Sequence, residues 1–488
     1  MVLGFVFFFI TLRCKTIVET MRRLTRWMAV MLLTLVLGAC VKPSRNFPPE
    51  DMGVRLDSTN LPIVWIEVNG DSIKRSERIE GRMKIIWNGE NSINYADTVA
   101  HPGQRIDYEG LIALRYRGNS TYNNSPKKPY SFRTLAEPLK KGGKKRKVSL
   151  LGMPQDNNWA LLAPYSDKSL IRDMLTFELA HPWMEYVPQG RHCELFVDGT
   201  YYGVFVLAEV VSKGKHRLNL KGPGDSGDAL TGDYLMEVDC NDDVTYTSKY
   251  HPVDTTGKPY TKHHILFQYK SPDHDNLSRE QLRYINGRID AMEAALVAGN
   301  YSQYIDVQSF IDYQLMTELC HNVDGYRLSG KFYKRRDSVD PRFKMVIWDT
   351  DLAYGNAKHR QGWRTDTWIY RNNNVMYQEQ EVYMVPFWWY VLNNDPQYTA
   401  QVKARWVQYR QGNLSNERVM AVVDSLANEL TSHGAEARNS QAWPCWGKWV
   451  WNNYYVATSY DDEITHLKEW LIERIAWMDR ELELGIRN

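Results

Sequence analysis

The chain has 488 residues, of which 43% are hydrophobic, 24% charged and 12% aromatic, including 17 Trp and 30 Tyr. These proportions are those of ordinary soluble globular proteins, and they exclude disorder, collagen and coiled coil as descriptions of the whole chain. The formal net charge is +2, but residues 1–40 carry five of the 60 basic residues and one of the 58 acidic ones. The remainder therefore has a net charge of −2, which gives no global electrostatic case for nucleic-acid binding.

Residues 21–39 are predicted to be a signal peptide. A positive segment with Arg22, Arg23 and Arg26 precedes an apolar stretch that is too short to span a membrane and ends in small residues. The ending Leu-Gly-Ala-Cys resembles the bacterial lipoprotein signal, in which the cysteine is acylated. We therefore expect a lipid on Cys40; an uncleaved anchor with an incidental cysteine is the alternative.

The lipoprotein signal implies a location in the bacterial cell envelope, on the periplasmic side or at the cell surface, with the membrane as a partner. Residues 40–56 are polar and carry three Pro, so we predict a lipidated tether. Residues 1–20 precede a complete signal and are interpreted as an over-long start outside the fold. The four later cysteines, Cys193, Cys240, Cys320 and Cys445, are either disulfide-bonded or buried thiols.

Residues 57–215 are predicted to form a β-rich lobe with one helix. Apolar and polar residues alternate in 61–70, 81–87 and 111–119, between Gly, Asn and Asp turns. Asp198-Gly199 separates two apolar runs, which predicts a hairpin.

The pattern predicts a helix over 167–180 that Asp167 caps. Leu170, Ile171, Met174 and Leu175 form an apolar stripe at helical spacing, and Glu178 shares it. Because burying an unpaired carboxylate is costly, we expect Glu178 to have a cationic partner.

Residues 216–488 are predicted to be a mainly helical lobe. Helices are expected near 278–298, after Asp306 and over 464–482, with two strands in 331–336 and 343–349. A β-rich segment followed by a helical one predicts an α+β fold with two lobes rather than alternating βα units.

A first polar cluster follows the strand that ends near Arg117. Arg117-Gly118-Asn119 begins a donor-rich loop, and Lys128 then shares strand parity with Tyr130 and Phe132. A strand lysine beneath a polar loop suits a phosphate site. The alternative is an ordinary hairpin, and Pro129 indicates an edge strand or bulge.

A second cluster carries three aspartates. Asp324 directly follows a helix, and Asp349 and Asp351 follow a strand and share one face if extended. Carboxylates at element ends suit a divalent metal and general-base work. Plain helix caps and turns are the alternative from spacing alone.

The two clusters together have the running order of a protein kinase, from a polar loop and strand lysine through a helix glutamate to a loop aspartate and a metal-type aspartate. The chain resembles the CotH kinase family, which has an atypical protein-kinase-like fold. The resemblance is carried, between about residues 111 and 356, by RGNSTYNNSPKKPY, NNWALLAPYSDKSLIRD, CELFVDGTYYGVFVLAEVV, GDYLMEVD, NVDGYRLSGKFYKRRD and WDTDLAYGN.

The resemblance implies a two-lobed, ATP- and Mg²⁺-dependent (or Mn²⁺-dependent) kinase that phosphorylates Ser or Thr of an exported protein. Asp324 would be the catalytic base, and Asp349 or Asp351 would bind the metal ion. Ser329 stands where ordinary kinases have a metal-binding Asn, and a neutral hydroxyl is a poorer Mg²⁺ ligand than an amide carbonyl oxygen.

The remaining roles concern the nucleotide. Lys128, with Lys127 as second choice, would hold the phosphates, and we assign Glu178 as its ion-pair partner. Arg117 and Asn119 would lie near the phosphates. The backbone after Glu209 would be the hinge that faces the adenine.

Two functions of other classes compete with the kinase. A catalytically weak or inactive kinase-like scaffold that binds an envelope partner is favoured by Ser329 and by the lack of an obvious ATP supply outside the cell. A polysaccharide-binding lipoprotein is suggested only by a cluster of tryptophans, namely Trp443, Trp446, Trp449 and Trp451.

Overall fold

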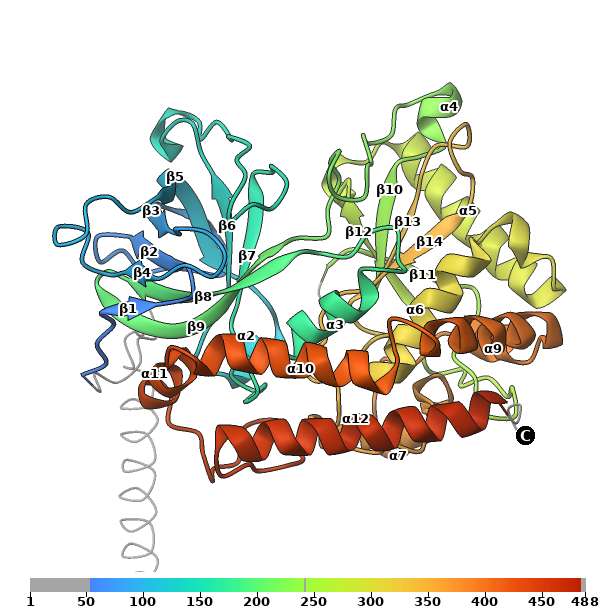
Figure 1. Cartoon of the computed structure of the whole chain (residues 1–488). Coiled ribbons are helices and arrows are strands. Elements are labelled where there is room, and N and C mark those ends of the chain that lie inside the picture. The colour runs from blue at the N-terminus through green and yellow to red at the C-terminus, as the bar shows by residue number, and fades with distance from the viewer. Residues whose placement is uncertain (1–52, 241–242, 484–488) are drawn as a thin grey trace, which may run out of the picture. The chain divides into compact units, whose positions relative to one another are not determined.

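A computed structural model describes residues 53–240 and 243–483 (Figure 1). The predicted signal peptide, Cys40 and most of the tether lie outside the described residues. The described residues fall within one compact unit. Within them, no helix has both the length and the apolar character needed to cross a bilayer.

The first half of the described chain forms a closed barrel in the order β2-β3-β5-β6-β7-β9-β8. Antiparallel pairs link neighbouring strands, and a parallel pair between β2 and β8 closes the barrel. A small sheet of β1 (Ser58–Thr59) and β4 (Asn94–Tyr95) accompanies it. The barrel strands are β2 (Ile63–Glu67), β3 (Ile79–Ile86), β5 (Ile106–Tyr116), β6 (Tyr130–Thr134), β7 (Asn158–Leu162), β8 (Gly190–Val197) and β9 (Thr200–Glu209).

Alternation along the barrel strands separates its core from its outer face. In β5, Leu114 and Tyr116 are buried inside the barrel, whereas Arg115 between them is exposed. The predicted hairpin at Asp198-Gly199 is confirmed, since Val197 pairs with Thr200, and both turn residues have positive φ.

The second sheet has the order β11-β12-β10-β13-β14 and is antiparallel throughout. Its strands are β10 (Tyr234–Val238), β11 (Thr245–Thr247), β12 (Leu266–Ser271), β13 (Gly330–Lys334) and β14 (Phe343–Val346). The two strands expected in 331–336 and 343–349 are therefore confirmed as neighbours.

The helices predicted from the sequence are present, but one of them begins later than expected. The helix that Asp306 caps, α6 (Val307–Cys320), is confirmed: the Asp306 carboxylate accepts the Ser309 N–H at 3.0 Å. The helix expected from residue 167 begins later, as α3 (Arg172–Ala180), because the Asp167 carboxylate instead accepts N–H groups of a preceding turn at Ser169 and Arg172.

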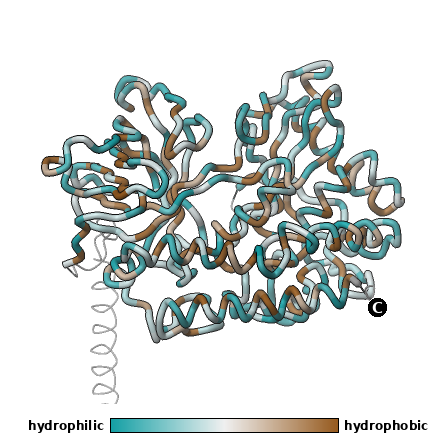
Figure 2. The backbone as a smooth tube through the Cα atoms, viewed as in Figure 1, coloured by the Kyte–Doolittle hydropathy of each residue, from teal (hydrophilic) through white to brown (hydrophobic). Residues whose placement is uncertain are grey.

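The other α-helices are α2 (Ser120–Asn124), α4 (Gly227–Leu230), α5 (Arg279–Ala298), α7 (Asn373–Gln378), α8 (Phe387–Asn393), α9 (Pro396–Arg410), α10 (Asn416–Thr431), α11 (Ala435–Ala442) and α12 (Tyr460–Glu483). Short 3₁₀ turns lie at Leu139–Lys141, His274–Asn276, Tyr301–Gln303, His359–Gln361 and Ile369–Arg371. Hydrophobic and hydrophilic residues alternate along α10 and α12, which run side by side (Figures 1 and 2). The mixture of sheets and helices confirms an α+β fold.

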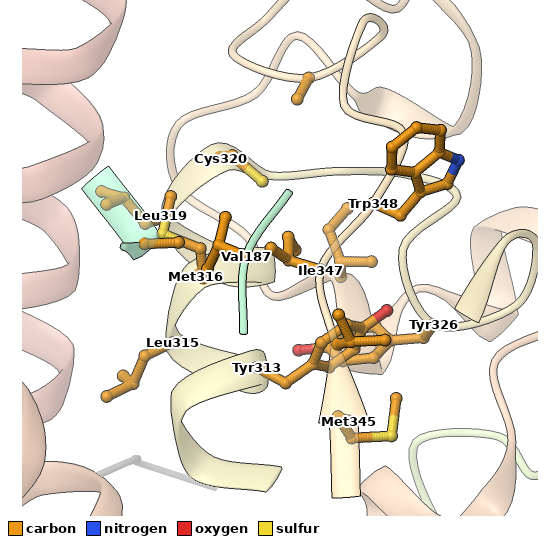
Figure 3. Close-up of a cluster of buried hydrophobic side chains, with 14 of the residues drawn as sticks. Val187, Tyr313, Leu315, Met316, Leu319, Cys320, Tyr326, Met345, Ile347 and Trp348 are labelled. Atoms are coloured by element: carbon orange, nitrogen blue, oxygen red, sulfur yellow. The ribbon is translucent and has the colours of Figure 1, made fainter. Parts of the chain in front are cut away.

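One hydrophobic cluster anchors the segments that carry the aspartates. Side chains of α6, including Leu315, Met316 and Leu319, gather with Ile347 and Trp348 beyond the end of β14 (Figure 3). All are buried, and together they fix the chain at the C-terminal end of α6 and after β14. Asp324 and Asp349 follow directly from these two anchored points.

Candidate functional site: a polar cavity lined by carboxylates

A cavity of about 1510 Å³ lies between side chains of the barrel, the second sheet and the segments after α6 and β14. It exceeds the roughly 300–1,000 Å³ of ordinary small-molecule sites. Six residues singled out in the sequence line this cavity: Arg117, Asn119, Asp324, Ser329, Asp349 and Asp351. Residues 210–214, which directly follow Glu209, line it as well.

Burial and neighbouring carboxylates in this cavity raise the pKa of Asp173 and of Asp351. Burial, and then repulsion from Asp349, raises the pKa of Asp173 to about 7, although Thr350 donates two hydrogen bonds to it. Burial, and then the charges of Asp349 and Asp173, raises the pKa of Asp351 well above its ordinary value. A cation is the natural partner of such a cluster.

Asp349 is held by the backbone as well as by its neighbours. Its φ of +65° lies in the left-handed region, which non-glycine residues seldom adopt, and Asn322 donates a hydrogen bond of 2.9 Å to its carbonyl oxygen. The Ser329 hydroxyl, also on a residue with positive φ, donates to the Asp349 carboxylate at 3.1 Å. Ser329 and Asp349 therefore present their oxygens together.

The Asp324 carboxylate faces the cavity with a quarter of its side chain exposed. The nearly buried Arg327 guanidinium lies 2.5 Å from one of its oxygens. Arg327 is itself held by Glu381 at 3.0 Å and by the Tyr383 carbonyl oxygen. This arrangement orients Asp324 but leaves its carboxylate accessible to a hydroxyl group in the cavity.

Arg117 stands between the barrel and the carboxylates. Its guanidinium lies 5.1 Å from the ring centre of Trp348, and burial lowers its pKa while Asp349 and Asp173 oppose that shift. Its Nη1 is buried and finds no hydrogen-bond partner in the described part of the chain. A buried unsatisfied donor beside an open cavity suits an anionic ligand such as phosphate.

The expected position of Lys128 is wrong: its side chain does not line the cavity. Its ammonium donates to the Tyr122 carbonyl oxygen and lies 4.9 Å from the Tyr122 ring centre. The strand begins only at Tyr130, and strand parity misleads because Tyr130 and Phe132 point into the closed barrel.

Lys127 also lies outside the cavity lining. Its ammonium donates to the Val204 carbonyl oxygen and to Asn439 at 2.8 Å. Burial lowers its pKa to about 7. Lys127 thus links the barrel to α11 and has no contact with the aspartates.

The predicted burial of Glu178 is also wrong, because its side chain is exposed. Helix α3 is covered on most of its surface, so Met174, Leu175 and Leu179 are buried, and Glu178 occupies the face that remains open. The α3 carboxylate that reaches the cavity is Asp173. Asp173 does not interrupt the apolar stripe, so the sequence pattern does not single it out. Its position in the first turn of α3 becomes apparent only once the helix is known to begin at Arg172.

Glu209 is buried just behind the cavity rather than in its lining. It pairs with Arg217 and accepts hydrogen bonds from the Tyr186 hydroxyl and the Gln189 N–H. This network anchors the end of β9, from which residues 210–214 enter the cavity.

Sequence reasoning also missed a charged group on the second sheet. Glu237 is buried between Lys331, with which it pairs, and Lys270 at 2.8 Å, and all three line the cavity. Strand alternation alone could not reveal it, because every residue of β10 is buried.

The donors at Asp349, Asp351 and Ser329 are all oxygens, which suits a hard divalent cation such as Mg²⁺. No group of three or more His, Cys, Asp or Glu side chains in residues 53–240 and 243–483 is arranged as a metal site. Mg²⁺ is usually held by one or two carboxylates together with substrate phosphates, so the donors fit an ion that arrives with a nucleotide.

The tryptophans of the sugar-binding alternative are mainly structural. Trp443 is buried and donates to the Tyr202 carbonyl oxygen, whereas Trp449 is 58% exposed. Trp446 and Trp451 pack against the main core. Cys193, Cys320 and Cys445 are buried thiols that form no disulfide in the described part of the chain.

The structure thus has a mixed α+β fold and one cavity that brings Asp324, Asp349 and Asp351 together. The model of the CotH kinase protein family matches residues 114–478. The chain therefore belongs to the CotH kinase family. A comparison with the curated proteins finds no match.

Proposed function

We propose that this protein is an ATP-dependent kinase that transfers the γ-phosphoryl group to a Ser or Thr hydroxyl of a protein. The observation that carries the proposal is the convergence of Asp324, Ser329, Asp349 and Asp351 on one cavity with residues 210–214. We further propose that the barrel and the helical part are the two lobes of a kinase-like fold, with 210–214 as the hinge.

In the proposed reaction the acceptor oxygen bonds to the γ-phosphorus while the bond from that phosphorus to the β–γ bridging oxygen breaks. ADP leaves, and the hydroxyl proton passes to the Asp324 carboxylate. Arg327, at 2.5 Å, keeps that carboxylate oriented toward the acceptor.

Asp349, Asp351 and Ser329 would hold Mg²⁺ or Mn²⁺ together with the phosphates. The ion supplies positive charge that offsets the phosphate oxygens. The Arg117 guanidinium, with its unsatisfied Nη1, would hold the phosphates in place of Lys128 or Lys127. Asp173 would add negative charge that strengthens the demand for a cation.

The test is transfer of labelled γ-phosphate to candidate exported proteins by the purified full chain. Asp324→Asn should lower the rate about 10²–10⁴-fold, the usual contribution of a general base. Asp424→Asn removes an exposed carboxylate of α10 and should leave the rate unchanged. Equal rates for the wild type and Asp324→Asn would refute the proposed chemistry and favour the scaffold alternative.

We also propose that the protein is a lipoprotein of the bacterial cell envelope, acylated at Cys40. The support is the segment 21–40, whose positive, apolar and small residues precede the cysteine. Metabolic labelling with a fatty acid would test this, since Cys40→Ala should abolish labelling.

A further inference from the structure

Six cationic side chains line the barrel side of the cavity. We call them the cationic wall: Arg75, Arg78, Arg115, Arg133, Lys145 and Lys147. Arg115 on β5 pairs in register with Ser131, and Arg133 on β6 pairs with Ala113. Because positions 113, 115, 131 and 133 share one face of these strands, both arginines stand on the outer face of the barrel.

Neighbouring carboxylates do not neutralise the cationic wall. Within the described residues, none of its six side chains forms an ion pair. Arg78 instead donates to the Ser131 carbonyl oxygen at 2.6 Å and to the Ser131 hydroxyl at 2.8 Å. These hydrogen bonds fix the guanidinium but leave its charge uncompensated.

The members of the wall repel one another. Burial, and then the charges of Arg133 and Arg115, lowers the pKa of Arg78 to about 9. Arg133 is also the largest cause of the lowered pKa of Lys145. Such crowding costs folding free energy, and a bound anion would relieve it.

The wall exceeds what a nucleotide needs. The cavity of about 1510 Å³ is larger than ordinary small-molecule sites of roughly 300–1,000 Å³. A divalent cation and the Arg117 guanidinium, which lines the same cavity, together offset most of the charge of a triphosphate. The six side chains of the cationic wall are additional to Arg117 in the lining of this cavity.

We propose that the cationic wall binds an acidic segment of the protein acceptor, rich in Asp, Glu or phosphorylated residues, beside the nucleotide. That the bound protein is a phosphoryl acceptor rests on the proposed function, whereas the binding of an acidic peptide does not. The wall would direct the enzyme to hydroxyls that lie next to acidic residues.

The opposite side of the cavity favours a peptide over a nucleic acid. Asp239, Asp243 and Asp273 line it on the side of the second sheet. These carboxylates would repel a chain that carries a phosphate at every unit. A peptide can present its acidic side chains to the wall and neutral ones to the sheet.

The test is fluorescence anisotropy of a labelled peptide of alternating Glu and Ser, with a Gln and Ser peptide for comparison, added to the full chain at low salt. The wild type should bind the acidic peptide at least tenfold more tightly than the neutral one. Arg115→Gln combined with Lys145→Gln, both exposed, should weaken acidic-peptide binding about tenfold.

The matched control is Arg82→Gln combined with Lys140→Gln, which removes two exposed charges of the barrel region outside the cavity lining. This control should bind the acidic peptide as the wild type does. A second variant, Arg75→Gln with Lys147→Gln, removes two other exposed charges of the wall and should also lose affinity. Equal binding of the acidic and neutral peptides, or full affinity in both wall variants, would overturn the proposal.

Two further outcomes would also overturn it. A loss of ATP affinity in the wall variants with unchanged peptide binding would assign the wall to the nucleotide. Tighter binding of a single-stranded oligonucleotide that displaces the peptide would assign it to nucleic acid. Asp324→Asn should bind the peptide normally, so a failure of phosphotransfer is distinguishable from a failure of peptide binding.

Discussion

The pKa values of Asp173, Asp349 and Asp351 are all raised, because each carboxylate is poorly solvated in the cavity and lies near another negative charge. Asp349 acts on Asp173 and Asp351, and Asp324 acts on Asp349. Folding tolerates this arrangement at a cost, since two ionised carboxylates in a poorly solvated site repel strongly. A divalent cation held with phosphate would turn the repulsion into attraction. The charge repulsion in the free protein therefore favours binding of a cation with its phosphate ligand.

Replacing Arg117 should harm ATP binding, whereas replacing Lys128 should not. Arg117 lines the cavity with an unsatisfied buried donor, while the Lys128 ammonium bonds the Tyr122 carbonyl oxygen outside it. We expect Arg117→Met to weaken ATP binding at least tenfold and Lys128→Met to change it less than threefold, in equilibrium binding measurements. A larger loss of ATP affinity in Lys128→Met than in Arg117→Met would show that Lys128, and not Arg117, binds the phosphates.

Glu381 should make the protein sensitive to acid. Burial alone would raise the pKa of Glu381, but Arg327 and Arg360 outweigh it and lower the pKa from 4.5 to about 2. A depressed pKa stabilises the fold above pH 4.5, and this contribution is lost as the pH falls toward about 2.

Glu381→Gln should therefore lower the free energy of unfolding by about 2 kcal/mol at neutral pH and by much less near pH 2, measured by urea denaturation. The exposed Glu67→Gln is the control and should show little change at either pH. A deficit of equal size at both pH values would contradict the assigned charge interaction.

For single residues, the sequence predicted the position along the chain better than the direction in which the side chain points. Asp324, Asp349 and Asp351, which line the cavity, could be singled out because they lie within five residues after a well-patterned helix or strand. Lys128 could not be oriented from the sequence, since alternation says which residues share a face but not that the inner face belongs to a closed barrel. Asp173 has no local signal, because its neighbours reach it only through tertiary folding.

At the scale of elements, Arg172 connects α3, α12 and the segment after Asp349. Its guanidinium lies 2.5 Å from Asp167 and 2.8 Å from Glu463, and it donates to the Ala353 carbonyl oxygen. All of these side chains are buried. The segment that carries Asp349 and Asp351 is thus fixed, through the Ala353 carbonyl oxygen, to a buried charged network.

Arg172→Met should destabilise the protein by about 3–5 kcal/mol, because it leaves two buried carboxylates without their cation. Chemical denaturation would measure the change, and the exposed Arg82→Met should cost less than about 0.5 kcal/mol. A loss below about 1 kcal/mol for Arg172→Met would show that the network is not important for stability.

The position of a helix was predictable where capping and periodicity agreed, as in α6, which Asp306 caps. The start of α3 was not, because Asp167 is also a good turn residue and the choice between cap and turn depends on its buried pair with Arg172. Which carboxylate of α3 reaches the cavity, Asp173 and not Glu178, depends on how the helix packs and not on its own periodicity.

At the scale of the whole molecule, the α+β class followed from the order of β-rich and helical segments. Closure of the barrel did not, because it depends on the parallel pairing of β2 with β8, strands separated by most of the barrel sequence. The size of the cavity likewise depends on how the barrel side chains meet the second sheet, which no local pattern encodes.

The most direct test of the central claim is the thermal unfolding of the full chain with ATP and Mg²⁺, together and separately. At 100 times the dissociation constant, the bound nucleotide should add about 2.7 kcal/mol of stability and raise the melting temperature clearly only when both are present. In Asp349→Asn combined with Asp351→Asn, the free protein should melt at a higher temperature, because the repulsion is gone, but the ligand-induced rise should vanish. An absent rise in the wild type, or an equal rise in the double variant, would contradict the account.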